Sequence, residues 1–158
     1  MTFNEKMENP PTNIINAGCY IFNRSVIDRI PDGKVVSVER ETFPQLLSSG
    51  EKVFGFVDSS YWLDIGTPAA LLKASNDLLS GRTKSAATPQ HSGDSLLMPG
   101  AKVDATAKIH SSVIGSGAKV GEGAELDSCV LFDGAKIGER ANLINTFVAK
   151  GFEVPAKT

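Results

Sequence analysis

Gly100-Ala101-Lys102-Val103 returns as Gly117-Ala118-Lys119-Val120 and again as Gly134-Ala135-Lys136-Ile137, so this part of the chain repeats every 17 residues. Aliphatic residues mark the repeat more finely, because they recur at steps of 6, 6 and 5 residues. Eleven positions keep this pattern without a slip in register: Leu97, Val103, Ile109, Ile114, Val120, Leu126, Leu131, Ile137, Leu143, Val148 and Val154. A short period with one aliphatic residue on each rung predicts a parallel β-helix, in which every coil has three short flat sides.

The repeat also predicts which side chains form the interior of the β-helix. We expect the eleven aliphatic residues to point into the prism and the polar residues between them to face water. Small residues keep the same step and are expected at the tight corners, as at Ala107, Ala124 and Ala141. About three coils should therefore cover residues 96–158.

Composition and charge exclude several classes of function. The chain has 158 residues and a net charge of −2, the balance of a soluble globular protein without a basic surface for nucleic acid. No apolar run reaches the roughly 18 residues of a membrane span, and residues 1–6 are polar, unlike a secretory signal. Cys19 and Cys129 are isolated thiols, not a disulfide framework or a metal ligand set. These features predict a cytoplasmic protein without nucleic-acid or membrane partners.

Residues 1–81 have a different pattern, which is typical of an α/β fold. The alternation of apolar residues predicts buried strands, and hydroxyl caps, prolines and glycines mark the ends of helices. The expected elements are strands at 15–22 and 53–57, helices at 25–30 and 37–47, and a helix that begins at Thr67-Pro68 and ends before Gly81. Pro44 should limit or kink the second helix.

The third of these helices has the clearest signals. Thr67 supplies a hydroxyl cap and Pro68 suits the first helical position, whereas Gly81 suits a left-handed C-cap. Its buried stripe is expected to consist of Leu71, Leu72, Leu78 and Leu79. Residues 82–95 are rich in Ser, Thr, Pro and Gly without periodicity, so we expect a linker between the α/β part and the β-helix.

Three short clusters in residues 1–81 carry side chains suited to a sugar phosphate. Glu5-Lys6 places an acceptor for a hydroxyl beside a cation for phosphate. Asn16-Ala17-Gly18 puts a carboxamide at a strand edge, next to a glycine that lets a ligand approach the backbone. Asp64 stands just before a helix, where one carboxylate can ligate Mg²⁺ together with substrate phosphates. Taken alone, each cluster fits a structural role better: a surface ion pair, a strand-end turn and an acid near a helix dipole.

Taken together and in this order, the clusters resemble a known family. The segments that carry the resemblance are Phe3-Asn4-Glu5-Lys6, Asn16-Ala17-Gly18-Cys19-Tyr20-Ile21-Phe22, Val38-Glu39-Arg40-Glu41-Thr42-Phe43-Pro44 and Tyr61-Trp62-Leu63-Asp64-Ile65-Gly66-Thr67-Pro68. They are similar to the C-terminal part of the sugar-nucleotide pyrophosphorylases, above all the bacterial mannose-1-phosphate guanylyltransferases with C-terminal hexapeptide repeats. The resemblance covers essentially the whole chain. It implies a left-handed β-helix, although parallel crossovers are otherwise nearly always right-handed.

The resemblance implies roles for five residues. Lys6 matches the catalytic lysine that contacts the sugar phosphate, and Asp64 matches the second of two aspartates that hold the catalytic Mg²⁺. Glu5 and Asn16 match residues that hold sugar hydroxyls, and Gly18 lies in the same wall. The family's Gly-rich phosphate loop and first metal aspartate belong to an N-terminal half that is not in this sequence. We therefore expect a fragment that is inactive alone.

The resemblance also implies the substrates, a sugar-1-phosphate and a nucleoside triphosphate. Mannose-1-phosphate and GTP would give GDP-mannose, while glucose and other nucleotides remain open. An uncapped β-helix presents unpaired backbone groups, so we further expect a homo-oligomer formed through it.

Two other functions compete with this interpretation. The first is a regulatory or structural pyrophosphorylase-like subunit without turnover, which the presence of Glu5, Lys6 and Asp64 disfavours. The second is a hexapeptide acyltransferase that uses a coil histidine as its base. His110 is the only candidate in the repeat, and a solvated surface histidine is the better interpretation.

Overall fold

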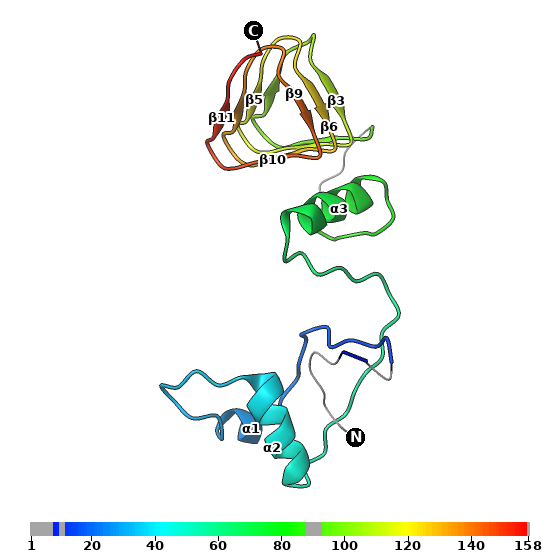
Figure 1. Ribbon diagram of the computed structural model, residues 1–158, viewed down its shortest axis with the longest axis vertical. Coiled ribbons are helices and arrows are strands. Elements are labelled where there is room, and N and C mark those ends of the chain that lie inside the picture. The colour runs from blue at the N-terminus through cyan, green and yellow to red at the C-terminus, as the bar shows by residue number, and fades with distance from the viewer. Residues whose placement is uncertain (1–7, 10–11, 88–92, 158) are drawn as a thin grey trace. The chain divides into compact units, whose positions relative to one another are not determined.

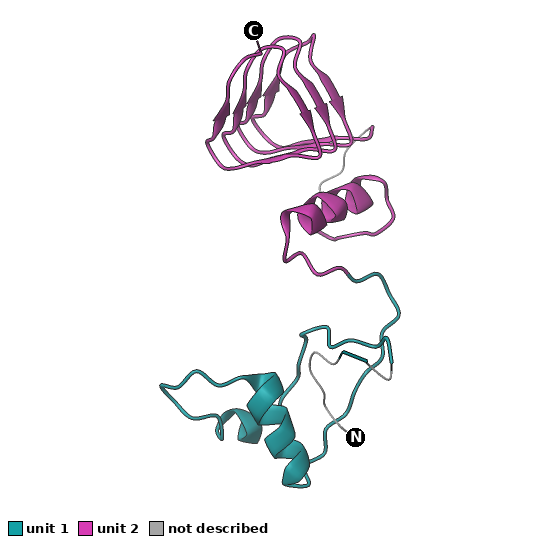
Figure 2. Cartoon of the chain, viewed as in Figure 1, with its two compact units in different colours: residues 1–62 teal, residues 63–158 magenta. Residues whose placement is uncertain are grey.

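The computed structural model describes residues 8–9, 12–87 and 93–157, and the chain divides into two compact units. Residues 1–62 form the first unit and residues 63–158 the second, as Figure 2 shows in teal and magenta. The fold therefore groups residues 63–81 with the repeat. The expected domain division after residue 81, with a linker over 82–95, rests on the sequence pattern and stays a prediction.

The second unit contains the parallel β-helix that the 17-residue repeat predicts (Figure 1). Its short strands form three parallel sheets, one for each flat side of the coil. The first sheet consists of β1 Leu96–Leu97, β4 Val113–Ile114, β7 Val130–Leu131 and β10 Phe147–Val148. The second consists of β2 Lys102–Val103, β5 Lys119–Val120, β8 Lys136–Ile137 and β11 Glu153–Val154. The third consists of β3 Lys108–His110, β6 Glu125–Asp127 and β9 Asn142–Ile144.

Each strand pairs with its equivalent one coil away, in a register of 17 residues. Leu97 stands opposite Ile114, which stands opposite Leu131, which in turn stands opposite Val148. Because equivalent aliphatic residues stack on one another, the axis of the β-helix is a continuous apolar core. Burial of each such side chain is worth roughly 1.5–3 kcal/mol.

The predicted interior is confirmed for the middle coils and is more open at the ends. Buried aliphatic residues of the pattern are Ile114, Val120, Leu126, Leu131, Ile137 and Val148. Partly exposed ones that pack against this core are Val103, Ile109, Leu143 and Val154. Leu97 is 51% exposed, because it lies on the first strand and no earlier coil in the described residues covers it.

The first unit contains short helices only, in the residues that the structure describes. These are α1 Arg24–Ile27, the π-helical turn η1 Val38–Thr42 and α2 Phe43–Ser48. The strands expected at 15–22 and 53–57 are wrong for this structure, since neither segment forms regular secondary structure. Ile21 is 99% exposed and Phe56 is 93% exposed. A strand with two apolar faces requires neighbouring strands, and the described residues of this unit supply none.

The helix expected over 37–47 forms in two parts. Ser37 caps it as predicted, since its hydroxyl oxygen accepts from the backbone N–H of Arg40 at 3.2 Å. The backbone N–H of Thr42 then bonds back to the carbonyl of Ser37, five residues earlier, at 3.3 Å. Pro44 has no N–H to continue that ladder, so α2 begins anew around it.

The helix opened by Thr67 is confirmed as α3, Pro68–Leu79, in the second unit. The Thr67 hydroxyl oxygen accepts from the backbone N–H of Ala70 at 3.2 Å, and Gly81 has a φ of 72°. The four stripe leucines are half-buried, whereas the buried positions of α3 are Ala74 and Asp77. None of the helices in the described residues is long and apolar enough to span a bilayer.

Candidate functional site

Asn16 lies at the centre of a hydrogen-bonded group in the first unit. Its carboxamide nitrogen donates to the Tyr20 hydroxyl and, over 2.8 Å, to Glu39 Oε1. The Tyr20 hydroxyl donates to the same Glu39 oxygen at 2.8 Å. The carboxamide oxygen of Asn16 accepts from the backbone N–H of Gly18 at 3.0 Å. We name these four residues, Asn16, Gly18, Tyr20 and Glu39, the Asn16 cluster.

Aromatic packing and η1 position the Asn16 cluster. The Tyr20 ring lies edge-on to the buried Phe43 ring, with 5.0 Å between centroids, and the Phe22 ring lies 5.9 Å from each of them. Glu39 stands on η1, and Phe43 begins α2 directly after it. Two consecutive helical segments, η1 and α2, therefore carry the carboxylate and the aromatic support beneath Tyr20.

The protonation of Tyr20 follows from its surroundings. Partial burial raises the pKa of the phenol, the hydrogen bond from Asn16 acts against this, and the Glu39 carboxylate adds to the rise. Tyr20 is therefore protonated at neutral pH and donates to Glu39. A carboxylate and a carboxamide oxygen can each accept more than one hydrogen bond, so Glu39 and Asn16 keep acceptor capacity for hydroxyl groups of a ligand.

Gly18 gives the backbone of the cluster its turn. Its φ of 74° lies in the left-handed region, which side chains with a Cβ rarely adopt. A Cβ added here would meet nothing within 4 Å, so the positive φ is what favours glycine and the neighbouring space is open. The expectation that Gly18 lets a ligand approach beside Asn16 stays a prediction.

Asp64 lies in the second unit, on an exposed loop that leads into α3. A Cβ on Gly66 would stand 3.2 Å from Asp64 Oδ1, so glycine keeps the space beside this carboxylate open. Within the described part of the chain, no group of three or more His, Cys, Asp or Glu side chains could hold a metal ion. An exposed carboxylate can supply one ligand to a hard cation that is otherwise bound by phosphates, and this role of Asp64 stays a prediction.

The structure brings together two of the five expected site residues, Asn16 and Gly18. Asp64 belongs to the other unit, and Glu5 and Lys6 lie outside the described residues. The roles assigned to all five stay predictions.

Two residues of the cluster, Tyr20 and Glu39, were missed as candidates. Both occur in segments that carry the family resemblance, which was the only available signal. Glu39 is 23 positions from Asn16. Only the fold of η1 brings the Glu39 carboxylate to the Asn16 carboxamide, and no local sequence motif predicts that contact.

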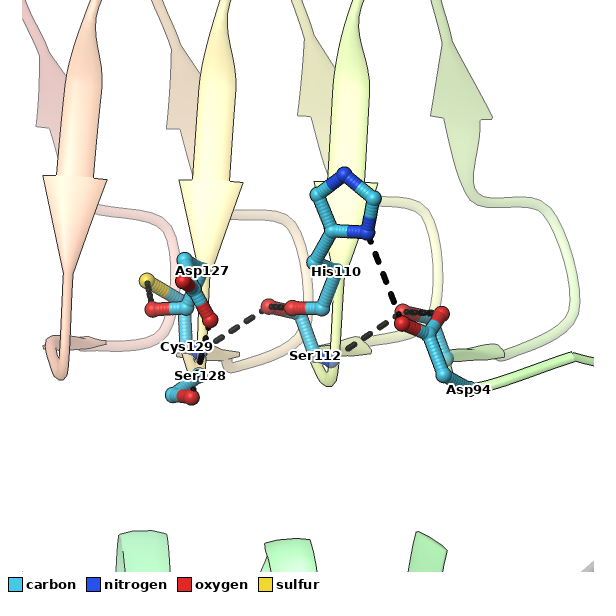
Figure 3. A network of polar contacts seen from close by, with 7 residues as sticks. Asp94, His110, Ser112, Asp127, Ser128 and Cys129 are labelled. Carbon is cyan, nitrogen blue, oxygen red and sulfur yellow. Dashed lines mark hydrogen bonds and ion pairs between the residues drawn. The ribbon is translucent and has the colours of Figure 1, made fainter.

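A second polar group lies at one corner of the β-helix (Figure 3). His110 Nδ1 is 3.5 Å from Asp94 Oδ2, and the histidine side chain is 68% exposed. Its solvated position agrees with the interpretation of His110 as a surface residue. The nearby hydroxyl of Ser112 is buried and donates to the carbonyl of His110 at 2.6 Å, so it is engaged within the corner.

Comparison with known proteins identifies the family. Residues 1–81, just over half of the chain, match the family model described as nucleotidyl transferase. The chain belongs to the nucleotidyl transferase family. Residues 82–158 match the model described as GlmU-like, C-terminal hexapeptide. The order expected from the sequence, an α/β part followed by a left-handed hexapeptide β-helix, is confirmed at the level of fold class.

Several similar proteins are named for the same activity. The chain is 51% identical over 117 residues to a mannose-1-phosphate guanylyltransferase of Mycobacterium tuberculosis (strain ATCC 25618 / H37Rv), covering 73% of this chain and 33% of that protein. It is 38% identical over 99 residues to a mannose-1-phosphate guanyltransferase of Neurospora crassa, covering 58% and 27%. It is 36% identical over 107 residues to a mannose-1-phosphate guanylyltransferase catalytic subunit beta of Drosophila melanogaster, covering 68% and 28%. The chain thus spans about a third or less of the length of these relatives.

Proposed function

We propose that this chain is part of an enzyme that makes GDP-mannose from mannose-1-phosphate and GTP. The observation that carries the proposal is the 51% identity to a mannose-1-phosphate guanylyltransferase over 117 residues. The Asn16 cluster supports it, because its carboxylate and carboxamide suit the hydroxyl groups of a sugar and are positioned by Tyr20, whose ring packs on the buried Phe43.

The proposed reaction requires alignment more than covalent help from the protein. A phosphate oxygen of the sugar-1-phosphate attacks the α-phosphorus of the triphosphate, a new P–O bond forms, and the bond to the bridging oxygen breaks as pyrophosphate leaves. Alignment of the attacking and leaving oxygens and stabilisation of the developing charge account for most of the rate. The triphosphate must be held by sequence that corresponds to the other two thirds of the relatives.

In this proposal the chain's own residues hold the sugar and its phosphate. Asn16 and Glu39 fix the hydroxyls of the mannose ring, and Gly18 keeps the approach to them open. Glu5 accepts from a further hydroxyl. Lys6 contacts the sugar phosphate through its ammonium group. This contact positions the attacking phosphate oxygen and partly neutralises the negative charge of the phosphate.

Mg²⁺ fits this site in part. Asp64 offers one exposed carboxylate with open space beside it, and Mg²⁺ is bound through one or two carboxylates plus substrate phosphates. When bound, the ion would neutralise charge on the transferring phosphoryl group. The role of Asp64 is then to fix the position of that charge relative to α3, which begins four residues later.

We also propose that the protein works in the cytoplasm as a homo-oligomer formed through the β-helix. The exposed Phe152 and the partly exposed Val154 offer apolar surface on the β-helix against which a second copy could pack.

The competing functions predict different behaviour. A regulatory subunit without turnover would bind sugar phosphate or nucleotide sugar but contribute nothing to catalysis. An acyltransferase would need His110 as an activated base. The contact with Asp94 could orient the imidazole, but the His110 side chain is 68% exposed to solvent, so we place this function last.

A hybrid enzyme tests the proposal. This chain replaces the matching segment of the M. tuberculosis guanylyltransferase, and pyrophosphate release from mannose-1-phosphate and GTP is measured. We expect the hybrid to form GDP-mannose, and Asn16→Ala to raise the KM for mannose-1-phosphate about tenfold with little effect on the KM for GTP. Asn23→Ala is the matched control, because Asn23 is exposed and its side chain caps no helix. A folded hybrid that prefers another sugar phosphate, or an Asn16→Ala variant with unchanged KM, would contradict the proposal.

A further inference from the structure

An open cavity of about 700 Å³ lies within the second unit, and its lining includes neither the Asn16 cluster nor Asp64. One wall is a side of α3 and the turn that follows it, and the other is the corner of the β-helix that leads into β10. The residues that bear on its chemistry are Leu72, Lys73, Asn76, Arg82, Asn145 and Phe147.

Two cations at this cavity share one buried carboxylate. Asp77 pairs with Lys73 and, at 3.5 Å, with Arg82. The Asp77 side chain is only 8% exposed, whereas those of Lys73 and Arg82 are 50% and 67% exposed. An ammonium has three donors and a guanidinium has five, so each cation keeps most of its donors after pairing with Asp77. Two cations and one carboxylate leave one net positive charge on this group.

The rest of the lining is mixed in character. The carboxamides of Asn76 and Asn145 come from opposite walls and can meet hydroxyls or ring heteroatoms. Leu72 and the Phe147 ring supply apolar surface between them, and Phe147 is held edge-on to Phe132 with 6.4 Å between centroids. A concave site with apolar walls and a few polar groups is typical of small-ligand binding.

We propose that this cavity binds a small organic phosphate that carries an aromatic ring. Its phosphate contacts the free donors of Lys73 and Arg82, and its ring lies against Leu72 and Phe147. The proposal does not rest on the proposed function, because the site uses other residues and needs no turnover. Since the ligand would contact both α3 and the β-helix, it would also fix these two elements relative to each other.

The proposal is tested by titrating the full chain with adenosine 5′-monophosphate. Amide shifts in ¹H–¹⁵N spectra locate the binding, and calorimetry measures its affinity. We expect amide shifts at residues 72–77 and 145–147. Adenosine alone and inorganic phosphate alone should each bind about tenfold more weakly than the nucleotide. Lys73→Gln should weaken binding of the nucleotide about tenfold. Asn76→Ala should weaken it while leaving the Asp77 ion pairs intact. Lys84→Gln is the matched control, because Lys84 is exposed and lies outside the cavity lining.

Three outcomes would overturn this site. The first is no binding at about 10 mM nucleotide, well beyond the affinity of a specific small-molecule site. The second is binding of equal strength in the wild type, Lys73→Gln and Asn76→Ala, with all three melting at the same temperature. The third is a set of amide shifts confined to the exposed lysines of the second sheet, Lys102, Lys119 and Lys136.

Discussion

Gly115 directly follows β4, at a position where the backbones of adjacent coils come very close. A Cβ added there would stand 2.5 Å from the carbonyl oxygen of Leu131, in the next coil. That oxygen also accepts the hydrogen bond from the Gly115 N–H at 2.8 Å, so neither backbone can move away freely. We expect Gly115→Ala to lower the free energy of unfolding by roughly 1–3 kcal/mol.

Thermal and denaturant melts measure this effect. Ser116→Ala is the control, because Ser116 donates to the Asp133 carboxylate of the next coil through its backbone N–H and not through its side chain. If both alanine variants melt at the wild-type temperature, the close approach at Gly115 is not present in solution.

The two cysteines should differ sharply in reactivity. Cys129 is buried and its Sγ lies 3.2 Å from the carbonyl oxygen of Asp127, while Cys19 is exposed. Burial raises the pKa of the Cys129 thiol above its usual range. We expect iodoacetamide at about pH 8 to label Cys19 and to leave Cys129 unmodified until the β-helix unfolds. Mass spectrometry of the labelled peptides decides this, and rapid labelling of Cys129 in the native chain would show that the corner is open.

The raised pKa of Cys129 also makes the stability of the β-helix depend on pH. Because the folded state favours the neutral Cys129 thiol, its contribution to stability is present below the ordinary pKa of a thiol. That contribution is lost as the pH rises through the raised pKa. Cys129→Ser should remove this alkaline loss, which melts at increasing pH would detect.

At the scale of elements, inward and outward positions of one strand should respond differently to the same charge. Val120 is buried in the core, and Lys119 beside it is exposed on β5. Val120→Asp removes burial worth roughly 1.5–3 kcal/mol and places a carboxylate in an apolar interior, so we expect the β-helix to unfold. Lys119→Asp should be silent or slightly stabilising, because Lys119 stands in register between Lys102 and Lys136. Equal melting temperatures for the two variants would contradict the register.

The sequence predicts some elements well because their causes are local. The repeat determines the inward and outward faces of each coil, and Thr67, Pro68 and Gly81 mark the ends of α3 through their own hydrogen bonds and dihedrals. The expected strands at 15–22 and 53–57 fail because their pairing depends on other strands. The π-helical turn before Pro44 follows from one missing N–H, yet its register could not be read from the pattern.

The same division applies to the candidate site. Asn16 and Gly18 could be chosen from sequence, since a carboxamide followed by a glycine turn is a local feature. Tyr20 and Glu39 could not be chosen, because their contact depends on where η1 folds.

At the scale of the whole molecule, the two units should differ in stability. Apolar side chains of the first unit, including Ile21, Phe54 and Phe56, are almost fully exposed, whereas the β-helix has a continuous buried core. We expect hydrogen exchange of the full chain to be slow over residues 102–154 and fast over residues 12–62. A variant ending at Gly81 should melt without cooperativity for the same reason. Protection over 15–22 equal to that of the β-helix would show that those segments already have strand partners.

The most direct test of the proposed catalytic role is Asp64→Asn in the hybrid with the M. tuberculosis enzyme. The substitution keeps the shape of the side chain and removes the charge that would hold Mg²⁺. We predict that kcat for GDP-mannose formation falls roughly a hundredfold and that more Mg²⁺ is needed for the remaining rate, with Asp58→Asn as a control on the same exposed stretch. Unchanged turnover and unchanged metal dependence in Asp64→Asn would contradict the account, and another carboxylate would then have to hold the metal.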